Sequence, residues 1–314
     1  MADVVKKATR EGYGSGLVKL GEKYDDFIVM DADLAAATKS GAFKKAFPER
    51  FYNCGIAEGN MIGIAAGIAA TGKKVFCSSF AMFAAGRAFE QIRNSVGYPH
   101  LNVKICATHA GISVGEDGAT HQCNEDIGVL RTIPGMVIIN PADTVEAEKA
   151  LEAMYNYEGP AYARFGRLAV PVIFDDDYKF EIGKSVELRE GNDVTIIATG
   201  LMVSEALVAY DILKAEGINA RIINMATIKP LDNEAVIKAA KETGAIVTAE
   251  EHSIIGGLGS AVLEALSENP VPVVRVGVND EFGMSGPAND LLDKFGLRGK
   301  DIAEKAKKAI ALKK

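Results

Sequence analysis

The sequence predicts an α/β fold made of two doubly wound domains, in which helices cover both faces of a parallel sheet. Short apolar segments of strand length alternate with longer segments of helical spacing from residue 24 to residue 167. The alternation lapses over residues 171–191, which contain three consecutive aspartates, and begins again at Asp193. We therefore predict a first domain over residues 1–170, a linker over 171–191 and a smaller second domain over 192–314.

The composition is that of a soluble globular protein. The chain has 314 residues, of which 48% are hydrophobic and 25% charged, so it is long enough to bury two cores. The formal net charge of -7 argues against a broad basic face for nucleic acid. The longest apolar run, residues 61–70, is too short to span a membrane. Four cysteines without C-x-x-C spacing, and a start without a hydrophobic signal segment, favour reduced thiols and a cytoplasmic location.

The elements of the first domain are predicted from apolar patterns and helix caps. The predicted strands are residues 27–30, 51–54, 75–79, 103–107, 136–141 and 161–167. The predicted helices are residues 3–22, 61–71, 81–95, 124–131 and, with Asp143 as N-cap, 144–157. The strand at 27–30 ends in Asp31-Ala32-Asp33. Asp33 therefore lies either at the sheet edge where α/β folds bind ligands or at the N-cap of the next helix.

Glu58 precedes the helix at residues 61–71, which consists almost wholly of Gly, Ala, Ile and Met. A helix that is apolar on all sides is expected to be buried, either in a core or against another subunit. A carboxylate at such a helix start could simply favour the helix dipole. Because this helix has no polar face, we expect Glu58 to be enclosed, and an enclosed carboxylate needs a partner and resists ionisation.

The stretch from residue 108 to residue 122, THAGISVGEDGATHQ, follows the predicted strand at 103–107 directly. It contains two of the four histidines, His109 and His121, the acidic pair Glu116 and Asp117, and three glycines. Loops at the carboxyl ends of parallel strands are where open α/β sheets bind ligands. Glycine lets the backbone approach a ligand closely, and imidazole titrates near neutral pH. The alternative is a glycine-rich turn in which the histidines are incidental.

The second domain repeats the alternation on a smaller scale. The predicted strands are residues 194–198, 220–224, 245–249 and 273–276, and the predicted helices are near 203–216, 232–242 and 260–267. Glu250-Glu251-His252 follows a strand end, and Gly256-Gly257-Leu258-Gly259 comes after it. The glycine spacing is not G-x-G-x-x-G, so we predict a tight turn into the next helix and interpret His252 as a surface or interface histidine.

Two further patterns have ordinary structural explanations. Phe80 and Phe83 lie one helical turn apart, a spacing that is more often core packing than a ligand wall. Arg10 is a lone arginine in the first predicted helix, and such a residue is usually solvated. On the residues alone, neither pattern assigns a function.

Four motifs, taken together, resemble transketolase. They are GEDGATHQ at 115–122, Asp31-Ala32-Asp33-Leu34, Gly55-Ile56-Ala57-Glu58 and Ser79-Phe80-Ala81-Met82-Phe83. They occur in the family's order, each at a predicted strand end or helix start, so the first domain resembles the pyrimidine-binding domain and the second the C-terminal domain. Transketolase also has an N-terminal domain that holds the diphosphate of thiamine diphosphate and Mg²⁺ through a G-D-G motif, and none precedes the four motifs here.

The resemblance therefore implies the C-terminal subunit of a split transketolase. An N-terminal partner subunit would carry the G-D-G motif, the diphosphate and Mg²⁺, and this chain would form a homodimer within a heterotetramer. The cofactor would lie between subunits, so the helix from residue 61 is a candidate interface element. The implied activity moves a two-carbon ketol unit from a ketose phosphate to an aldose phosphate, as in the pentose phosphate interconversions.

The resemblance also implies a role for individual residues. Glu58 matches the carboxylate that hydrogen-bonds the pyrimidine nitrogen, Phe80 and Phe83 the wall on which the pyrimidine stacks, and Asp33 an acid near the thiazolium and substrate. His109 and His121 match the family's proton-transferring, substrate-facing histidines. The remaining matches are to substrate ligands: Asp117 to the acid that reads a sugar hydroxyl, and Arg10 and Arg164 to the phosphate-binding arginines.

Three positions depart from the family pattern, and they bear on acceptor preference and phosphate affinity. Ala110 stands where an acid is usual, Ala37 where a phosphate-side serine is usual, and Gly86 where a tyrosine is common. Two alternatives to a transketolase stay open: the first shares this domain order, and the second requires no catalysis. One is the β-subunit of a 2-oxo acid dehydrogenase or the matching part of a deoxyxylulose phosphate synthase, and the other is a non-catalytic partner that only completes an oligomer.

Overall fold

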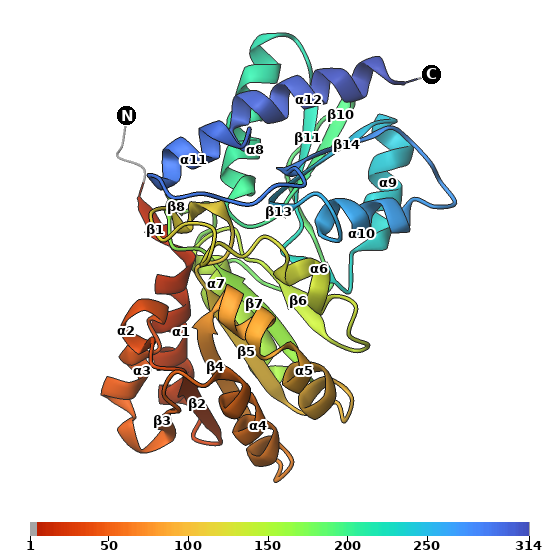
Figure 1. The fold of residues 1–314 in the computed structure, drawn as a ribbon. Coiled ribbons are helices and arrows are strands. Elements are labelled where there is room, and N and C mark those ends of the chain that lie inside the picture. The colour runs from red at the N-terminus through yellow and green to blue at the C-terminus, as the bar shows by residue number, and fades with distance from the viewer. Residues whose placement is uncertain (1–4, 314) are drawn as a thin grey trace.

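Two α/β units make up the structure, a computed structural model that describes residues 5–313. The first unit occupies the lower part of Figure 1 and the second the upper part, with the last helix lying across the top. The sequence-based prediction of two domains with helices packed on sheets is confirmed. No helix within the described range combines the length and apolar character needed to cross a bilayer.

The first sheet has seven strands, and all neighbouring pairs but one are parallel. In spatial order they are β12 (Thr227–Lys229), β6 (Val137–Ile139), β7 (Ala161–Phe165), β5 (Val103–Thr108), β4 (Lys74–Phe80), β2 (Phe27–Asp31) and β3 (Phe51–Asn53). The exception is β12, which pairs antiparallel with β6 although it comes from the second half of the chain. Residues beyond the predicted linker therefore complete the first sheet.

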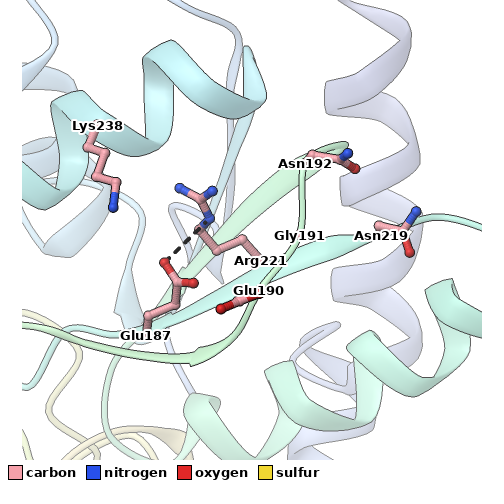
Figure 2. Close-up of a pocket in the computed structure, with 7 residues that line it drawn as sticks. All are labelled: Glu187, Glu190, Gly191, Asn192, Asn219, Arg221 and Lys238. Atoms are coloured by element: carbon pink, nitrogen blue, oxygen red, sulfur yellow. Dashed lines mark ion pairs between the residues drawn. The ribbon is translucent and has the colours of Figure 1, made fainter.

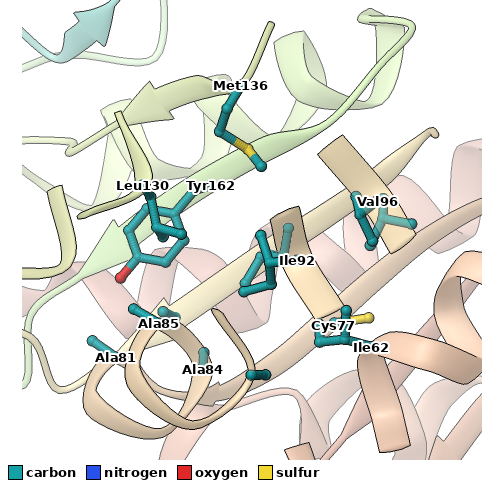
Figure 3. Close-up of a cluster of buried hydrophobic side chains, with 14 of the residues drawn as sticks. Ile62, Cys77, Ala81, Ala84, Ala85, Ile92, Val96, Leu130, Met136 and Tyr162 are labelled. Carbon is teal, nitrogen blue, oxygen red and sulfur yellow. The ribbon is translucent and has the colours of Figure 1, made fainter. Parts of the chain in front are cut away.

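Two hydrophobic clusters cover the two faces of this sheet. One packs the strands against α1 (Thr9–Lys23), α3 (Gly41–Ala46) and α7 (Thr144–Asn156). The other packs them against α4 (Glu58–Ala69), η2 (Met82–Arg87), α5 (Phe89–Gln91), η3 (Ile92–Gly97) and α6 (Asp126–Leu130). Figure 3 shows this second cluster, in which Ile92 and Tyr162 lie among the small side chains of Ala81, Ala84 and Ala85.

The structure corrects the prediction at both ends of the first domain. Residues 6–8 form a strand, β1 (Lys6–Ala8), that pairs antiparallel with β8 (Ala169–Pro171), and helix α1 begins only at Thr9. The predicted start at residue 3 lies outside the described residues. The predicted helix at 81–95 is not one α-helix but two π-helical segments, η2 and η3, on either side of the short α5.

The second sheet has five strands. In spatial order they are β14 (Val273–Val278), β13 (Ile246–Ser253), β10 (Val194–Ala198), β11 (Ala220–Asn224) and β9 (Val186–Arg189). The strand β9 lies in the predicted linker and pairs antiparallel with β11. One face is covered by α8 (Met202–Ala215), α11 (Ala288–Lys294) and α12 (Gly299–Ala311), and the other by α9 (Asn233–Thr243) and α10 (Leu258–Ala265).

Two features of the second sheet were not predicted. The helices α11 and α12 follow the last strand, where no further strand signals a continuing alternation. Strand β13 also runs to Ser253 rather than ending at residue 249, so Glu250, Glu251 and His252 lie within it. Of the two interpretations of His252, the surface histidine is wrong because the side chain is fully buried, and the interface histidine fits. Its Nε2 accepts a hydrogen bond from the Gly128 amide of the first domain (3.2 Å).

The segment between the two sheets is fixed by hydrogen bonds to α7. Asp143 is the N-cap of this helix, as predicted, because its Oδ1 accepts the Glu146 amide (2.8 Å). Its Oδ2 accepts the amides of Ile173 and Phe174 from the connecting segment (2.6 and 2.8 Å). The predicted linker is therefore an ordered connection, held at the N-terminus of a first-domain helix.

Candidate active site

The predicted site residues come mainly from the carboxyl ends of neighbouring parallel strands. Strands β2, β4, β5 and β7 lie side by side in register, so their carboxyl ends share one edge of the first sheet. Asp33 follows β2, Phe80 ends β4 and His109 follows β5. This edge is where open α/β sheets place ligands.

Glu58 is enclosed, as the sequence predicts. It is the first residue of α4, and only 1% of its surface is exposed. Its Oε1 accepts a hydrogen bond from Ser79 Oγ at the end of β4 (3.1 Å), and its Oε2 pairs with Arg87 Nη1 from η2 (2.6 Å). Half of the Arg87 side chain is exposed, so the buried carboxylate is linked to solvent through this cation.

The two phenylalanines form a group with the two histidines. The rings of Phe80 and Phe83 are stacked with centroids 6.0 Å apart, and the Phe80 ring stacks on His109 at 3.8 Å. The His121 ring lies edge-on to Phe83, with centroids 5.2 Å apart. The guanidinium of Arg87 lies over the Phe83 ring, 4.8 Å from its centroid. Phe80 and Phe83 thus connect Glu58, through Arg87, with both predicted histidines.

His109 is held neutral by its surroundings. Its Nε2 lies 3.1 Å from Arg10 Nη1 and its Nδ1 lies 2.8 Å from Thr108 Oγ1. Because arginine can only donate, Nε2 must accept, and the ring proton must be on Nδ1. Burial, and then the charges of Arg10 and Arg167, lower the pKa of His109 to about 3. The residue also has a φ of +57°, so the backbone at this loop start adopts a left-handed conformation.

Arg10 is fixed by a loop that a buried aspartate organises. Its Nη1 donates to the carbonyl oxygen of Ala37 (3.0 Å) as well as contacting His109. Asp31 holds that loop by accepting hydrogen bonds from Thr38 Oγ1 (2.8 Å) and Ser40 Oγ (2.9 Å), and burial raises its pKa. Arg10 is therefore a positioned cation and not the solvated surface residue that its isolation in the sequence suggested.

Arg164 does not join this group. Its side chain is 3% exposed, its Nε pairs with Asp126 Oδ2 (2.8 Å), and its Nη2 donates to the carbonyl oxygens of Cys123 (3.1 Å) and Glu251 (2.8 Å). These partners neutralise the buried guanidinium and fix its orientation. Arg164 also lines a small cavity with Thr9 and Ala110, and its role as a phosphate ligand stays a prediction.

Arg167 is the second arginine near the site, and sequence reasoning missed it. Its Nη1 donates to the carbonyl oxygen of Val114 and pairs with Glu116 Oε2 (3.1 Å), and it lies 4.0 Å from Asp117 Oδ2. Its charge lowers the pKa of both Arg10 and His109. It follows β7 by two residues, and its place at a strand's carboxyl end was the available signal.

The remaining predicted residues lie on the exposed side of the group. Asp117 is partly exposed beside Arg167, and His121 is half-buried with its Nδ1 2.9 Å from Thr120 Oγ1. Asp33 is exposed, and its Oδ1 accepts from Asn53 Nδ2 (2.9 Å). It does not cap the next helix, α2 (Ala35–Thr38), because Asp31 Oδ1 accepts the Leu34 amide there (2.5 Å).

A metal site and a hollow in the second domain are the other possibilities for ligand binding. Among residues 5–313, no group of three or more His, Cys, Asp and Glu side chains could hold a metal ion. A shallow polar hollow in the second domain is shown in Figure 2, where Arg221 points toward Glu187 (3.5 Å). Arg221 also pairs with Glu242 (2.6 Å), so its charge is balanced, and the hollow contains none of the predicted site residues.

Together, the fold and the site define a transketolase-type pairing of a pyrimidine-binding domain with a C-terminal domain. The family model for the transketolase pyrimidine binding domain matches residues 5–172, and the model for the transketolase C-terminal domain matches residues 183–302. The chain belongs to the transketolase family.

Some of its relatives are named as sections or subunits of a transketolase, and in others, such as human transketolase, the match covers about half of the longer chain. It is 53% identical to a Methanocaldococcus jannaschii protein whose name describes a transketolase C-terminal section, over 96% of both chains. It is 45% identical to a 6-deoxy-6-sulfo-D-fructose transketolase subunit of Clostridium sp., covering 95% of this chain and 92% of that one. A solved split gene transketolase, described as an inactive beta4 tetramer, superposes with a TM-score of 0.90 at 51% identity, covering 98% of this chain and 99% of that chain.

Proposed function

We propose that this chain is the C-terminal subunit of a thiamine diphosphate-dependent transketolase that moves a two-carbon ketol unit from a ketose phosphate to an aldose phosphate. One observation carries the proposal: a buried carboxylate, two stacked phenylalanines and two histidines from three separate segments meet at the ligand-binding edge of the first sheet. Packing alone does not require an ionisable group at the start of an apolar helix.

The residues present suit the pyrimidine end of the cofactor. When bound, thiamine diphosphate supplies a nucleophilic carbon and an electron sink for breaking the bond beside a ketone. Glu58 would hydrogen-bond the pyrimidine ring nitrogen and hold the proton there, and Phe80 and Phe83 would stack on the ring. Arg87 already neutralises Glu58 from the solvent side (2.6 Å), which would keep the carboxylate oriented before the ring enters.

The histidines and arginines suit a phosphorylated sugar. His109, neutral and oriented by Arg10, and His121 would hydrogen-bond the sugar hydroxyls and carbonyl and move protons during bond cleavage. Asp117 would accept a hydroxyl, and Asp33 would lie toward the thiazolium and substrate. Arg10, with Arg164 as the sequence predicts and with Arg167 nearby, would bind the phosphate, and this is how an acidic chain could hold an anion locally.

A partner subunit would supply what this chain does not. We infer that an N-terminal transketolase subunit with a G-D-G motif holds the diphosphate and Mg²⁺, and that two copies of each chain form a heterotetramer. The supporting feature is α4, which buries Met61 and Ile62 but exposes Gly63, Ile64 and Gly67 on its other side. An exposed apolar stripe beside Glu58 suits a subunit interface next to the cofactor.

The sugar itself is a separate question. One relative is named for a sulfonated fructose and another for apulose 4-phosphate, so unusual ketoses are substrates to test beside xylulose 5-phosphate. A 2-oxo acid substrate is the competing chemistry. The pair His109 and His121 favours a polyhydroxylated ketose, because His121 Nε2 can hydrogen-bond a hydroxyl and His109 could do so by exchanging its contact with Arg10. A panel of ketose phosphates and 2-oxo acids separates the two chemistries.

The test is reconstitution of the complex. This chain, its N-terminal partner, thiamine diphosphate and Mg²⁺ are assayed with xylulose 5-phosphate and ribose 5-phosphate. Glu58→Gln, which keeps the shape of the side chain, should reduce kcat by at least ~100-fold, the usual scale for losing a proton-transferring group. Glu22→Gln, at an exposed position of α1, is the control. Full activity of the Glu58 variant, or of His121→Ala, would instead favour a non-catalytic subunit.

A further inference from the structure

The loop with both histidines, residues 108–122 and here called the histidine loop, is held by the second domain as well as by the first. Gln122 Nε2 donates to the carbonyl oxygen of Met284, before α11 (2.9 Å), and to those of Ile112 (3.1 Å) and Gly115 (3.3 Å) in the loop. Ile112 is fully buried within the hydrophobic cluster of the second domain. The histidine loop is part of the first domain in sequence, but it is anchored in the hydrophobic core of the second domain.

Glu251 of β13 makes the central polar contact with this loop. Its Oε1 accepts the amide of Ser113, the second residue of the single turn η4 (Ile112–Val114), at 2.5 Å. The carboxylate is buried, and its own backbone carbonyl accepts Arg164 Nη2 (2.8 Å). Arg164 is in turn paired with Asp126 of α6. A continuous set of polar contacts therefore runs from the first domain, through Glu251, to the histidine loop.

At Gly111, the backbone of the histidine loop lies directly against the Glu251 carboxylate. Gly111 has a φ of +82°, and a Cβ built there would lie 2.5 Å from the Glu251 carboxyl carbon. Any side chain at Gly111 would displace Glu251, and any movement of Glu251 would free the turn that follows His109. The amide of Ser113 would then be a buried donor without an acceptor.

We propose that Glu251 is a positioning residue, through which the second domain fixes the histidine loop and so sets the placement of His109 and His121. The inference deepens the proposed function and relies on it for what the loop does in catalysis. It also gives the second domain a role at the active site, although none of its side chains belongs to the proposed catalytic group. Misplacement of a catalytic group by about 1 Å can cost ~100-fold in rate.

The neighbouring Glu250 provides a matched control. It lies on the same strand and is equally buried, and it also accepts backbone amides, but these are Leu258 (2.7 Å) and Gly259 (2.8 Å) at the start of α10. Glu250→Ala and Glu251→Ala therefore remove the same chemistry from adjacent positions. Only the second substitution removes a contact with the histidine loop.

The first measurement uses the isolated full-length chain labelled with ¹⁵N in its four histidines. Imidazole signals assigned by single substitutions should shift or broaden for His109 and His121 in Glu251→Ala. Glu251→Gln keeps the acceptor oxygen and should restore them, and Glu250→Ala should leave them in place. Unchanged His109 and His121 signals in Glu251→Ala, or equal shifts in Glu250→Ala, would overturn the proposal.

The second measurement is activity of the reconstituted complex. Glu251→Ala should lower kcat by 10- to 100-fold with a smaller change in KM, and Glu251→Gln should recover most of it. Wild-type kcat in a folded Glu251→Ala would also overturn the proposal. If Glu251→Ala does not fold, Glu251→Asp, which withdraws the carboxylate by one methylene, takes its place. An inactive wild-type complex would count against the proposed function, while the imidazole signals would still decide the role of Glu251.

Discussion

His109 and its two arginine neighbours show how single residues set the protonation of the site. Burial, and then the positive charges of Arg10 and Arg167, keep the His109 imidazole neutral well below pH 6 by lowering its pKa. A folded pKa of about 3 lies below that of an unfolded histidine, so the unfolded chain binds the proton more readily. The contribution of the neutral His109 imidazole to stability is therefore present above pH 6.5 and is lost as the pH falls toward 3.

Arg164 and Arg167 should respond differently to the same substitution. Arg167→Met should raise KM for a phosphorylated ketose by about 10-fold or more and leave the free energy of unfolding nearly unchanged, because its carboxylate partners are exposed. Arg164→Met leaves Asp126 buried without its partner and should cost about 3 kcal/mol. Urea denaturation of both variants measures the loss of stability, and steady-state kinetics measures the change in KM. Equal KM effects with equal loss of stability would contradict the assignment.

The sequence predicts the chemistry of this site better than the choice between neighbouring residues. Glu58, Phe80 and His109 stand out as candidates because each lies at the start or end of an element with a clear apolar pattern. Arg164 and Arg167 are three positions apart on the same segment, and either could face a ligand. Arg164 turns inward because Asp126 lies on another element, α6. Arg87 escaped notice because its partner, Glu58, lies 29 residues away.

Among the elements, the region after β4 shows a departure from regular helix geometry that its sequence does encode. Ala84, Ala88, Ile92 and Val96 are all buried and recur every four residues. In a regular α-helix, such a repeat turns by about 40° at each step and would leave one face. The wider π-helical turns of η2 and η3 keep these side chains on one face. The prediction of one α-helix failed because it assumed a period of 3.6 residues.

Helix α4 gives the prediction that belongs to elements. A Cβ at Gly63 or Gly67 would meet nothing within 4 Å, so alanine at both positions should stabilise the isolated chain by about 1–2 kcal/mol in total through helix propensity. If this face contacts the partner subunit, the same double variant should assemble less well. Thermal denaturation measures the first effect, and light scattering of the mixed subunits measures the second.

The control for α4 is a glycine inside another helix. A Cβ at Gly16 of α1 would lie 2.7 Å from Leu151 Cδ1, so Gly16→Ala should destabilise the chain although the chemical change is identical. A Gly63→Ala, Gly67→Ala chain that is less stable than wild type would contradict an open face. Within this chain α4 is covered on one side only, so burial of its other face against another subunit stays a prediction.

At the scale of the whole molecule, a buried carboxylate connects the two domains. Glu146 in the first turn of α7 accepts the Tyr178 hydroxyl from the connecting segment (2.7 Å) and Asn224 Nδ2 from the second sheet (2.7 Å). The Ala142 amide also donates to it (2.7 Å). Burial raises its pKa to about 7, since these neutral donors do not fully replace water.

This raised pKa predicts the pH dependence of stability. The folded chain binds the Glu146 proton more tightly than the unfolded chain, so the contribution is complete below pH 4.5 and is lost as the pH rises through 7. At about 1.4 kcal/mol per pKa unit, the loss is about 3 kcal/mol. Glu146→Gln cannot ionise, so the difference in unfolding free energy between wild type and this variant should change by that amount between pH 4.5 and 8.

The measurement is urea denaturation followed by circular dichroism at several pH values in that range. Glu152→Gln, at an exposed ion pair on the same helix, should leave the pH profile of the wild type unchanged. His109 contributes to the pH dependence with the opposite sign, but it does so in both proteins. Its contribution therefore cancels when the unfolding free energies of wild type and Glu146→Gln are subtracted. A constant difference across the range would show that Glu146 does not titrate there.

The arrangement of the domains was predictable in outline but not in its boundaries. The alternation of apolar segments correctly indicated two helix-covered sheets. It could not show that β9 and β12 leave that order, because both are short and pair antiparallel at sheet edges. Such pairing depends on contacts between distant residues, whereas an apolar pattern reports only which side chains are buried.

The position of β12 also has a consequence for how the protein is made. During synthesis, β6 leaves the ribosome well before Thr227–Lys229, which pair with its free side in the described part of the chain. Until those residues emerge, the nascent first sheet presents open backbone amides and carbonyls to any passing polypeptide. Proteolysis or a stop codon just before β12 would therefore leave an aggregation-prone fragment, although that fragment contains every residue assigned to the catalytic group.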